Sequence, residues 1–179
     1  VFAQMAADTV GLKVEDVHVV TNQDTDVTPY GAGAYASRQT YVGGFAIKQT
    51  GELLKEKILG HAHTLTRMPV DILDIVKGNI VRKTDNRVLM SLGELATKIL
   101  YDFELSEHMA AESTYSVKSN AYSFGVSIAE VEVDIPLCKV ELLNIVNVHD
   151  CGILINPPLA EAQVHGGMSM GIGFGLYEE

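Results

Sequence analysis

A long helical pattern from Gln39 to about Arg67 constrains the fold of this chain more than any other feature. Apolar residues recur along it at the spacing of one helix face, and charged residues occupy another face. An amphipathic helix of this kind has to bury its apolar stripe against other elements. The stripe consists of Leu54, Ile58, Ala62 and Leu65. The charged face consists of Lys48, Glu52, Lys55 and Glu56.

Shorter elements are expected on both sides of this helix. The sequence predicts a helix from Phe2 to Val10 that stops at Gly11, and a short strand over Val17–Val20. After Pro69, the runs Ile72–Val76 and Ile80–Arg82 are typical of strands joined by a turn at Gly78. Ser91 and Glu94 have the spacing of a capping box, which predicts a helix ending near Tyr101. Residues 102–119 lack periodicity and are expected to form a long connection.

The second half of the sequence predicts a hairpin and a final helix. Apolar residues alternate from Phe124, then alternate one residue out of phase from Val131, which indicates a bulge near Ala129–Glu130. A turn containing Pro136 leads to a second strand over Val140–Val148. Asn156-Pro157-Pro158 opens a helix over Ala160–Tyr177, because proline is tolerated in a first helical turn. The expected fold class is α+β, with a small mixed or antiparallel sheet and packed helices.

Composition excludes several classes of partner. The chain has 179 residues, of which 47% are hydrophobic and 20% charged, and its formal net charge is −10. This charge argues against nucleic acid or an anionic membrane as the main partner, since both need a basic surface. Cys138 and Cys151 are the only cysteines, which favours a reduced, cytoplasmic setting. No apolar run is long enough for a transmembrane helix, and no signal peptide is evident.

The length fits one domain or two small ones, and we expect residues 1–179 to be one region without a further boundary. The chain begins with Val1 directly in an amphipathic pattern and closes after a glycine-rich apolar run. We therefore expect it to be a piece of a larger protein.

The stretch from Gln23 to Thr40 is the strongest candidate for a binding site. It places glycines, short hydroxyl side chains and Arg38 just before the long helix. If the helix begins near Gln39, its free backbone amides would face this loop and form a seat for an anion. The alternative is an ordinary helix start, with Ser37 as the capping residue and Arg38 on the surface.

A second candidate combines Gln163 and His165 with five glycines of the last predicted helix. Glycine inside a helix costs roughly 1 kcal/mol relative to alanine, so the glycines need a reason. Close approach of a ligand is one reason, and tight packing against another helix is the alternative. The glycines are Gly166, Gly167, Gly171, Gly173 and Gly175.

Two further groups of residues are weaker candidates. His149-Asp150-Cys151 resembles a catalytic or metal cluster, but adjacent residues of an extended segment point to opposite faces and do not converge. His61 and His63 lie two residues apart on the long helix, which is poor geometry for a shared metal. We expect both groups to be loop, surface or packing residues.

Several of these segments resemble one family. The stretches QDTDVTPYGAGAYASRQTYV, EVEVDIPLCKV and NVHDCGILINPPLAEAQVHGGMSMGIG are similar to the molybdenum-binding subunits of bacterial xanthine dehydrogenases. These enzymes form part of the xanthine oxidase/aldehyde oxidoreductase family. The resemblance covers essentially the whole chain, and the YASRQ and AQVHGG motifs are specific to this superfamily.

The resemblance implies a molybdenum hydroxylase that carries molybdenum on molybdopterin and hydroxylates an electron-poor carbon of a purine or a related substrate. Electrons would leave through iron–sulfur clusters and a flavin (FAD) on other domains or subunits. The resemblance also implies that the loop matching the YASRQ motif borders the molybdenum and binds the cofactor, and that Gln163 lies beside the pterin. The matching loop residues are Tyr35, Ala36, Ser37, Arg38 and Gln39.

The resemblance places the family's catalytic glutamate and an upstream cofactor loop outside the matched region. We therefore expect no catalytic residue and no metal ligand in this chain, and we expect the isolated chain to be inactive and to bind molybdopterin weakly or not at all. Relatives that act on an aldehyde, nicotinate or an aromatic thioester stay open as alternatives, as does a non-catalytic module that keeps the fold. The apolar residues Val1 and Phe2 and the Met168–Leu176 run predict self-association.

Overall fold

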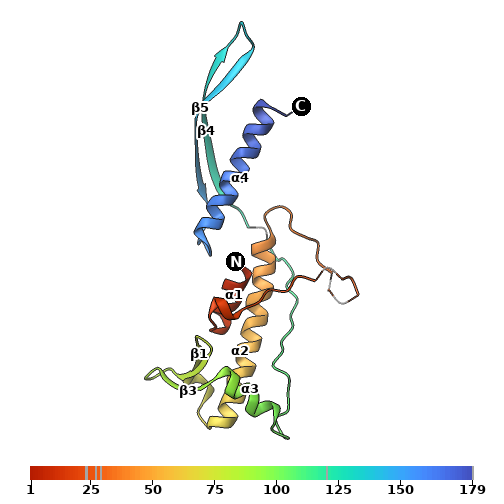
Figure 1. Cartoon of the computed structure of the whole chain (residues 1–179), viewed down its shortest axis with the longest axis vertical. Coiled ribbons are helices and arrows are strands. Elements are labelled where there is room, and N and C mark those ends of the chain that lie inside the picture. The colour runs from red at the N-terminus through yellow and green to blue at the C-terminus, as the bar shows by residue number, and fades with distance from the viewer. Residues whose placement is uncertain (23, 27, 29, 120, 179) are drawn as a thin grey trace. The chain divides into compact units, whose positions relative to one another are not determined.

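The chain folds as two separate units, Val1–Lys118 and Ser119–Glu179, in the computed structural model (Figure 1). The structure describes residues 1–22, 24–26, 28, 30–119 and 121–178. Each unit combines helices with an antiparallel sheet, and every strand pairing among these residues is antiparallel. The predicted α+β class is therefore confirmed.

Helix α2 (Gly44–Thr66) runs through the first unit, and α1 (Phe2–Val10) packs beside it (Figure 1). Glycines on α2 allow this packing, because a Cβ atom at Gly44 would lie 2.6 Å from Met5 Cε and one at Gly51 would lie 2.8 Å from Thr9 Cγ2. Helix α1 ends at Gly11 as predicted, with a φ of 94° that favours glycine. A side chain at Gly11 would also collide with the Ile75 carbonyl.

A three-stranded meander and α3 (Leu92–Leu100) pack against α2 to form the core. The strands are β1 (Leu73–Val76), β2 (Asn79–Arg82) and β3 (Arg87–Ser91). The predicted capping box is present, since the Ser91 side chain accepts from the Glu94 amide and Glu94 bonds back to the Ser91 amide. The buried core cluster comprises Val10, Ile58, Leu59, Ala62, Leu73, Ile75, Ile80, Leu95 and Ile99.

Two sequence expectations for the first unit need correction. Residues Val17–Val20 form no strand, because Val14–Asp16 is a short 3-10 helix and the following valines have no strand to pair with among the described residues. Residues Arg87–Ser91, for which the sequence pattern predicted no strand, form β3 after a turn at Asn86 with a φ of 55°. The described part of this unit also has a π-helical turn over Gln39–Gly43 and a 3-10 helix over Val70–Ile72. A connecting segment without regular secondary structure, residues 102–118, runs along α2 (Figure 1).

The second unit consists of a long hairpin and one helix. Strands β4 (Phe124–Asp134) and β5 (Lys139–Asp150) pair with a register shift between Glu130 and Val131, next to the predicted bulge. Helix α4 (Pro157–Leu176) contacts β5 and begins at Asn156, whose side chain accepts from the Leu159 amide at 3.1 Å. No side chain among residues 121–178 is buried.

Candidate functional site

The Tyr35–Gln39 loop is held in a strained backbone conformation. Ala36 and Ser37 have φ angles of 50° and 53°, so two successive residues other than glycine occupy the left-handed region. Such residues cost of order 1–3 kcal/mol each and are concentrated at ligand-binding sites. Both residues are exposed, so the conformation does not serve the packing of a core.

Arg38 closes this loop on itself. Its Nη1 donates to the Gly33 carbonyl at 3.1 Å, and its guanidinium carbon lies 4.9 Å from the Tyr35 ring centroid. Its backbone amide also donates to the Tyr35 carbonyl at 3.2 Å. These three contacts fix the guanidinium beside the loop, where it can add positive charge to a site for an anionic group.

A π-helical turn over Gln39–Gly43 connects the loop to α2. Arg38 occupies the capping position, and its side chain forms no capping hydrogen bond. The alternative of an ordinary start capped by Ser37 is therefore wrong. Because π-helical turns occur frequently at functional sites and the amides at a helix start are natural anion donors, this geometry favours a binding role for the loop.

The loop offers groups for binding but lacks the side chains most often used as general bases. Residues Tyr35–Gln39 include no carboxylate and no histidine. They offer backbone amides, the Ser37 hydroxyl, the Arg38 guanidinium and the Gln39 carboxamide, which together suit a polar ligand that carries negative charge. Within the described ranges, no three His, Cys, Asp or Glu side chains gather as metal ligands.

Gln163 lies exposed on α4, in the second unit, whereas the loop belongs to the first. A Cβ atom added at Gly166, Gly167, Gly171 or Gly175 would meet no described atom within 4 Å. In the part of the chain that the structure describes, no element packs closely against these four glycines, so tight helix packing does not explain them there. Gly173 differs, because the Glu178 side chain covers it.

The histidine and cysteine groups take local roles. Asp150 accepts a hydrogen bond from the Gly152 amide at 3.0 Å, which makes a turn after β5. His61 Nε2 lies 3.0 Å from Glu107 Oε2, and His63 Nδ1 lies 2.6 Å from the Met68 carbonyl. The two histidines therefore contact different partners, and Cys138 and Cys151 are free and exposed.

Sequence reasoning missed an aromatic cluster beside the loop. The Phe45 and Tyr115 rings stack with centroids 5.1 Å apart, and Tyr41 meets both rings edge-on. A side-chain hydrogen bond with Tyr41 raises the pKa of Tyr115 above its usual value. Tyr41 and Phe45 lie four residues apart at a helix start, and this spacing places two side chains on the same helix face. The sequence could therefore have indicated that these two rings lie side by side.

Comparison with known proteins gives matches over the whole chain. Residues 1–179 match the molybdopterin cofactor-binding domain family. The xanthine dehydrogenase molybdenum-binding subunit of Escherichia coli O157:H7 is 48% identical over 180 residues, which is 100% of this chain and 24% of that protein. The nicotine 6-hydroxylase large subunit of Paenarthrobacter nicotinovorans is 25% identical over 99% of this chain and 22% of its own length.

Solved structures give the same result. Quinoline 2-oxidoreductase from Pseudomonas putida 86 superposes with a TM-score of 0.81 and 27% identity, over 96% of this chain and 22% of that chain. A Cu,Mo-CO dehydrogenase superposes with a TM-score of 0.79 and 26% identity, over 93% of this chain and 21% of its own. The present chain thus spans less than a quarter of the length of these larger proteins.

Proposed function

The chain belongs to the molybdopterin cofactor-binding domain family, and from this premise we propose that it forms part of the cofactor pocket of a xanthine dehydrogenase-like molybdenum hydroxylase. The observation that carries the proposal is the strained Ala36–Ser37 backbone at the start of the π-helical turn. The 48% identity to a xanthine dehydrogenase molybdenum-binding subunit supports the choice of enzyme class.

The loop residues fit a pterin that carries a phosphate. The backbone amides of residues 36, 37 and 39 and the Ser37 hydroxyl would donate hydrogen bonds to the polar atoms of the cofactor, while the Arg38 amide is already bonded to the Tyr35 carbonyl. The Arg38 guanidinium would lie beside its negative charge, and the Gln39 carboxamide would add a further donor and acceptor. The role of Gln163 beside the pterin is proposed on the family resemblance alone. Tyr35 supports the guanidinium through its ring. When bound, the cofactor supplies the redox chemistry of substrate hydroxylation.

In the proposed role, this chain binds and orients the cofactor and supplies no catalytic residue. Because the loop lacks a carboxylate or histidine, the general base has to come from outside Tyr35–Gln39. Exposed small residues such as Ala36 leave the approach to the cofactor open for substrate. The isolated 179-residue chain is accordingly expected to be inactive.

A purine or another N-heterocycle is the proposed substrate class. Iron–sulfur and flavin subunits are the proposed partners, since the cofactor chemistry releases electrons that have to be carried away. The cytoplasm is the proposed location, which the two free cysteines favour. Among the described helices, none is long and apolar enough to cross a membrane.

A relative with another substrate is the second candidate, because nicotine 6-hydroxylase and CO dehydrogenase also match this chain. Activity assays on the purified holoenzyme that contains this chain separate the two. Assays with xanthine, hypoxanthine, nicotinate and an aldehyde, together with the molybdenum content, are the measurement. We expect stoichiometric molybdenum and the highest kcat/KM for a purine. A loaded enzyme that prefers an aldehyde would move the substrate to the second candidate, and an enzyme without molybdenum would reject the proposal.

A further inference from the structure

We propose that the connecting segment positions the cofactor-binding loop, through Tyr115 and its contacts with Tyr41 and Phe45. The inference rests on the proposed function, because it assigns a positioning role toward that same site. Its basis is a series of contacts between the segment and α2 that ends at the π-helical turn. All of these residues lie in the first unit.

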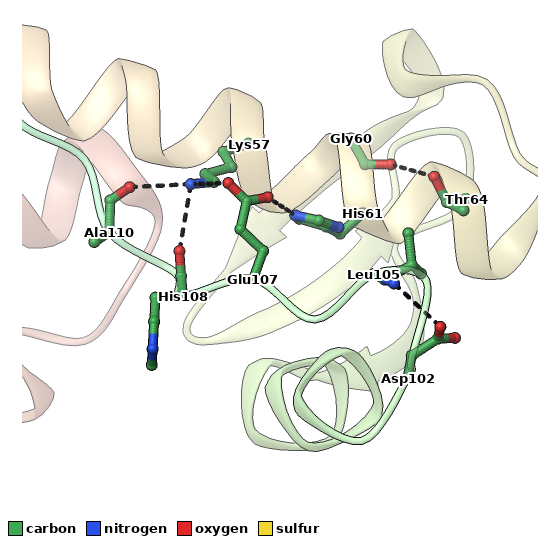
Figure 2. A network of polar contacts seen from close by, with 9 residues as sticks. All are labelled: Lys57, Gly60, His61, Thr64, Asp102, Leu105, Glu107, His108 and Ala110. Atoms are coloured by element: carbon green, nitrogen blue, oxygen red, sulfur yellow. Dashed lines mark hydrogen bonds and ion pairs between the residues drawn. The ribbon is translucent and has the colours of Figure 1, made fainter.

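The first anchor of the segment lies on the C-terminal half of α2 (Figure 2). Glu107 bridges two α2 side chains, with Oε1 2.5 Å from Lys57 Nζ and Oε2 3.0 Å from His61 Nε2. Lys57 Nζ also donates to the carbonyls of His108 and Ala110 at 3.3 Å each. One lysine thus holds three successive parts of an otherwise irregular segment.

The second anchor lies about two turns nearer the helix start. The hydroxyls of Ser113 and Thr50 are 2.6 Å apart, and Ser113 Oγ also donates to the Ala46 carbonyl at 3.4 Å. Two residues further along the segment, Tyr115 stacks on Phe45. Segment numbers rise while α2 numbers fall, so the segment runs antiparallel to the helix and delivers Tyr115 to its N-terminal end.

Tyr41 connects this contact to the site. It lies inside the Gln39–Gly43 turn, only two residues beyond Gln39, and its ring meets the Tyr115 ring edge-on with centroids 6.4 Å apart. The Val42 amide donates to the Arg38 carbonyl at 2.8 Å, so a shift of the turn would move the loop with it. A π-helical turn is rarely stable on its own, and tertiary contacts such as these are what can hold it.

If Tyr115 only stabilised the fold, its loss would lower the amount of folded protein and leave each bound molybdenum centre unchanged. The buried core cluster does not include Tyr41, Phe45 or Tyr115, and all three side chains remain partly exposed. Loss of the Tyr115 ring should therefore disturb the loop more than it disturbs global stability. The effect should appear in the properties of each bound molybdenum centre, which a loss of folded protein alone would not change.

The test uses the holoenzyme with Tyr115→Leu, Tyr115→Phe and the control Tyr101→Leu. Tyr101 is 79% exposed at the end of α3 and takes no part in the ring contacts among Tyr41, Phe45 and Tyr115. Measurements are kcat per molybdenum atom, the Mo(V) electron paramagnetic resonance spectrum, and hydrogen exchange of residues 39–43. Phe45→Leu removes the same ring stacking by changing the residue on α2. This variant tests the inference if Tyr115→Leu does not fold.

We expect Tyr115→Leu to lower kcat per molybdenum by at least about tenfold, to alter the Mo(V) spectrum and to speed exchange in residues 39–43. Tyr115→Phe keeps the ring and should restore most of each property, whereas Tyr101→Leu should match the parent. Unchanged exchange and an unchanged Mo(V) spectrum in Tyr115→Leu would overturn the inference. A parent holoenzyme without molybdenum would instead overturn the proposed function, and the exchange data would then still decide whether the segment orders the turn.

Discussion

Ala36 carries the most specific requirement of any single residue in the loop. Its φ of 50° lies in the left-handed region, which is sterically unfavourable for alanine and in which a β-branched side chain is a strong outlier. The residue is exposed, so the penalty serves no packing purpose in the first unit. We interpret the conformation as one that the cofactor site requires.

Ala36→Val should therefore weaken cofactor binding by about tenfold, which corresponds to about 1.4 kcal/mol of lost affinity, and should lower the molybdenum content of the holoenzyme. The added methyl groups disfavour the left-handed conformation that the loop needs. Molybdenum content measured by mass spectrometry checks the result. Ala34→Val is the matched control, because Ala34 is exposed in the same loop without a positive φ. Ala36→Gly, which tolerates the conformation, should keep full loading, and equal loading of all three variants would contradict the interpretation.

The sequence indicated where this loop lies but not how it is bent. Polar residues and glycines before a helical pattern identify a loop at a helix start. The left-handed residues are Ala36 and Ser37, and neither type signals a positive φ in the way that glycine or asparagine does. The π-helical turn was equally hidden, because Gln39–Gly43 continues the apolar pattern of the helix that follows.

At the level of elements, the close packing of α1 on α2 depends on glycines of α2. Gly51→Ala and Gly60→Ala make a matched pair, since both replace a glycine within α2. A Cβ at Gly51 would lie 2.8 Å from Thr9 Cγ2, while one at Gly60 would meet no described atom within 4 Å. Thr9 is held in place by its hydrogen bond to the Met5 carbonyl at 2.7 Å.

Gly60→Ala should raise the free energy of unfolding by about 0.5–1 kcal/mol through helix propensity. Gly51→Ala should lower it by about 1 kcal/mol or more, because the clash outweighs the same gain. Urea denaturation of the two variants measures the difference. Stabilisation of similar size by both substitutions would show that the α1–α2 contact is not tight.

The Glu107 bridge gives a prediction for pH. The hydrogen bond from Lys57 lowers the pKa of Glu107 below its usual value, and His61 contributes in the same direction. A carboxylate whose pKa is lower in the folded state stabilises the fold above its unfolded pKa of about 4.3, and that stabilisation is lost as the pH falls through the folded value. Glu107→Gln should therefore lower the melting temperature at pH 7, and this effect should become smaller as the pH falls below about 4.3.

Melting temperatures of the parent and Glu107→Gln across this pH range are the measurement. Glu112→Gln is the control, because Glu112 is an exposed glutamate of the same connecting segment. A difference between parent and Glu107→Gln that stays constant from pH 7 to pH 3 would rule out the ion pair as its source.

Elements with local signals were predicted well, and elements that depend on partners were not. The Ser91 capping box, the Gly11 helix end and the bulge of the hairpin each have a signature within a few residues. Val17–Val20 had the composition of a strand, but a strand needs a neighbour to pair with. Strand β3 was missed because its residues Arg87–Ser91 follow a charged turn and expose their first half.

At the level of the whole molecule, the described residues of the second unit form no buried core. Phe174 is 74% exposed and Met170 is 65% exposed on α4, and the hairpin also exposes its apolar side chains. Phe2, in contrast, packs against the π-helical turn that precedes α2, since a Cβ at Gly43 would lie 2.8 Å from its ring. The apolar surface available for association therefore lies mainly on the second unit.

The isolated chain should self-associate because large exposed apolar patches drive association. Sedimentation velocity at increasing concentration should show species larger than a monomer, and Met170→Lys combined with Phe174→Lys should shift them toward monomer. Tyr30→Lys is the control for added charge, because Tyr30 is 95% exposed in the first unit. A parent chain that stays monomeric at high concentration would contradict the prediction.

The family resemblance inferred from the sequence is confirmed by the match over residues 1–179. The motifs that carried it, YASRQ and AQVHGG, fall in different units, so local structure alone could not have connected them. The role of Gln163 beside the pterin remains a prediction of the resemblance, as do the roles of Tyr35–Gln39.

Diffraction from the cofactor-loaded holoenzyme at the molybdenum absorption edge tests the central claim most directly. The account predicts an anomalous molybdenum peak beside the loop, with cofactor atoms in contact with the backbone of Ala36–Gln39 and with Gln163. A fully loaded enzyme in which the cofactor contacts neither the loop nor Gln163 would contradict it.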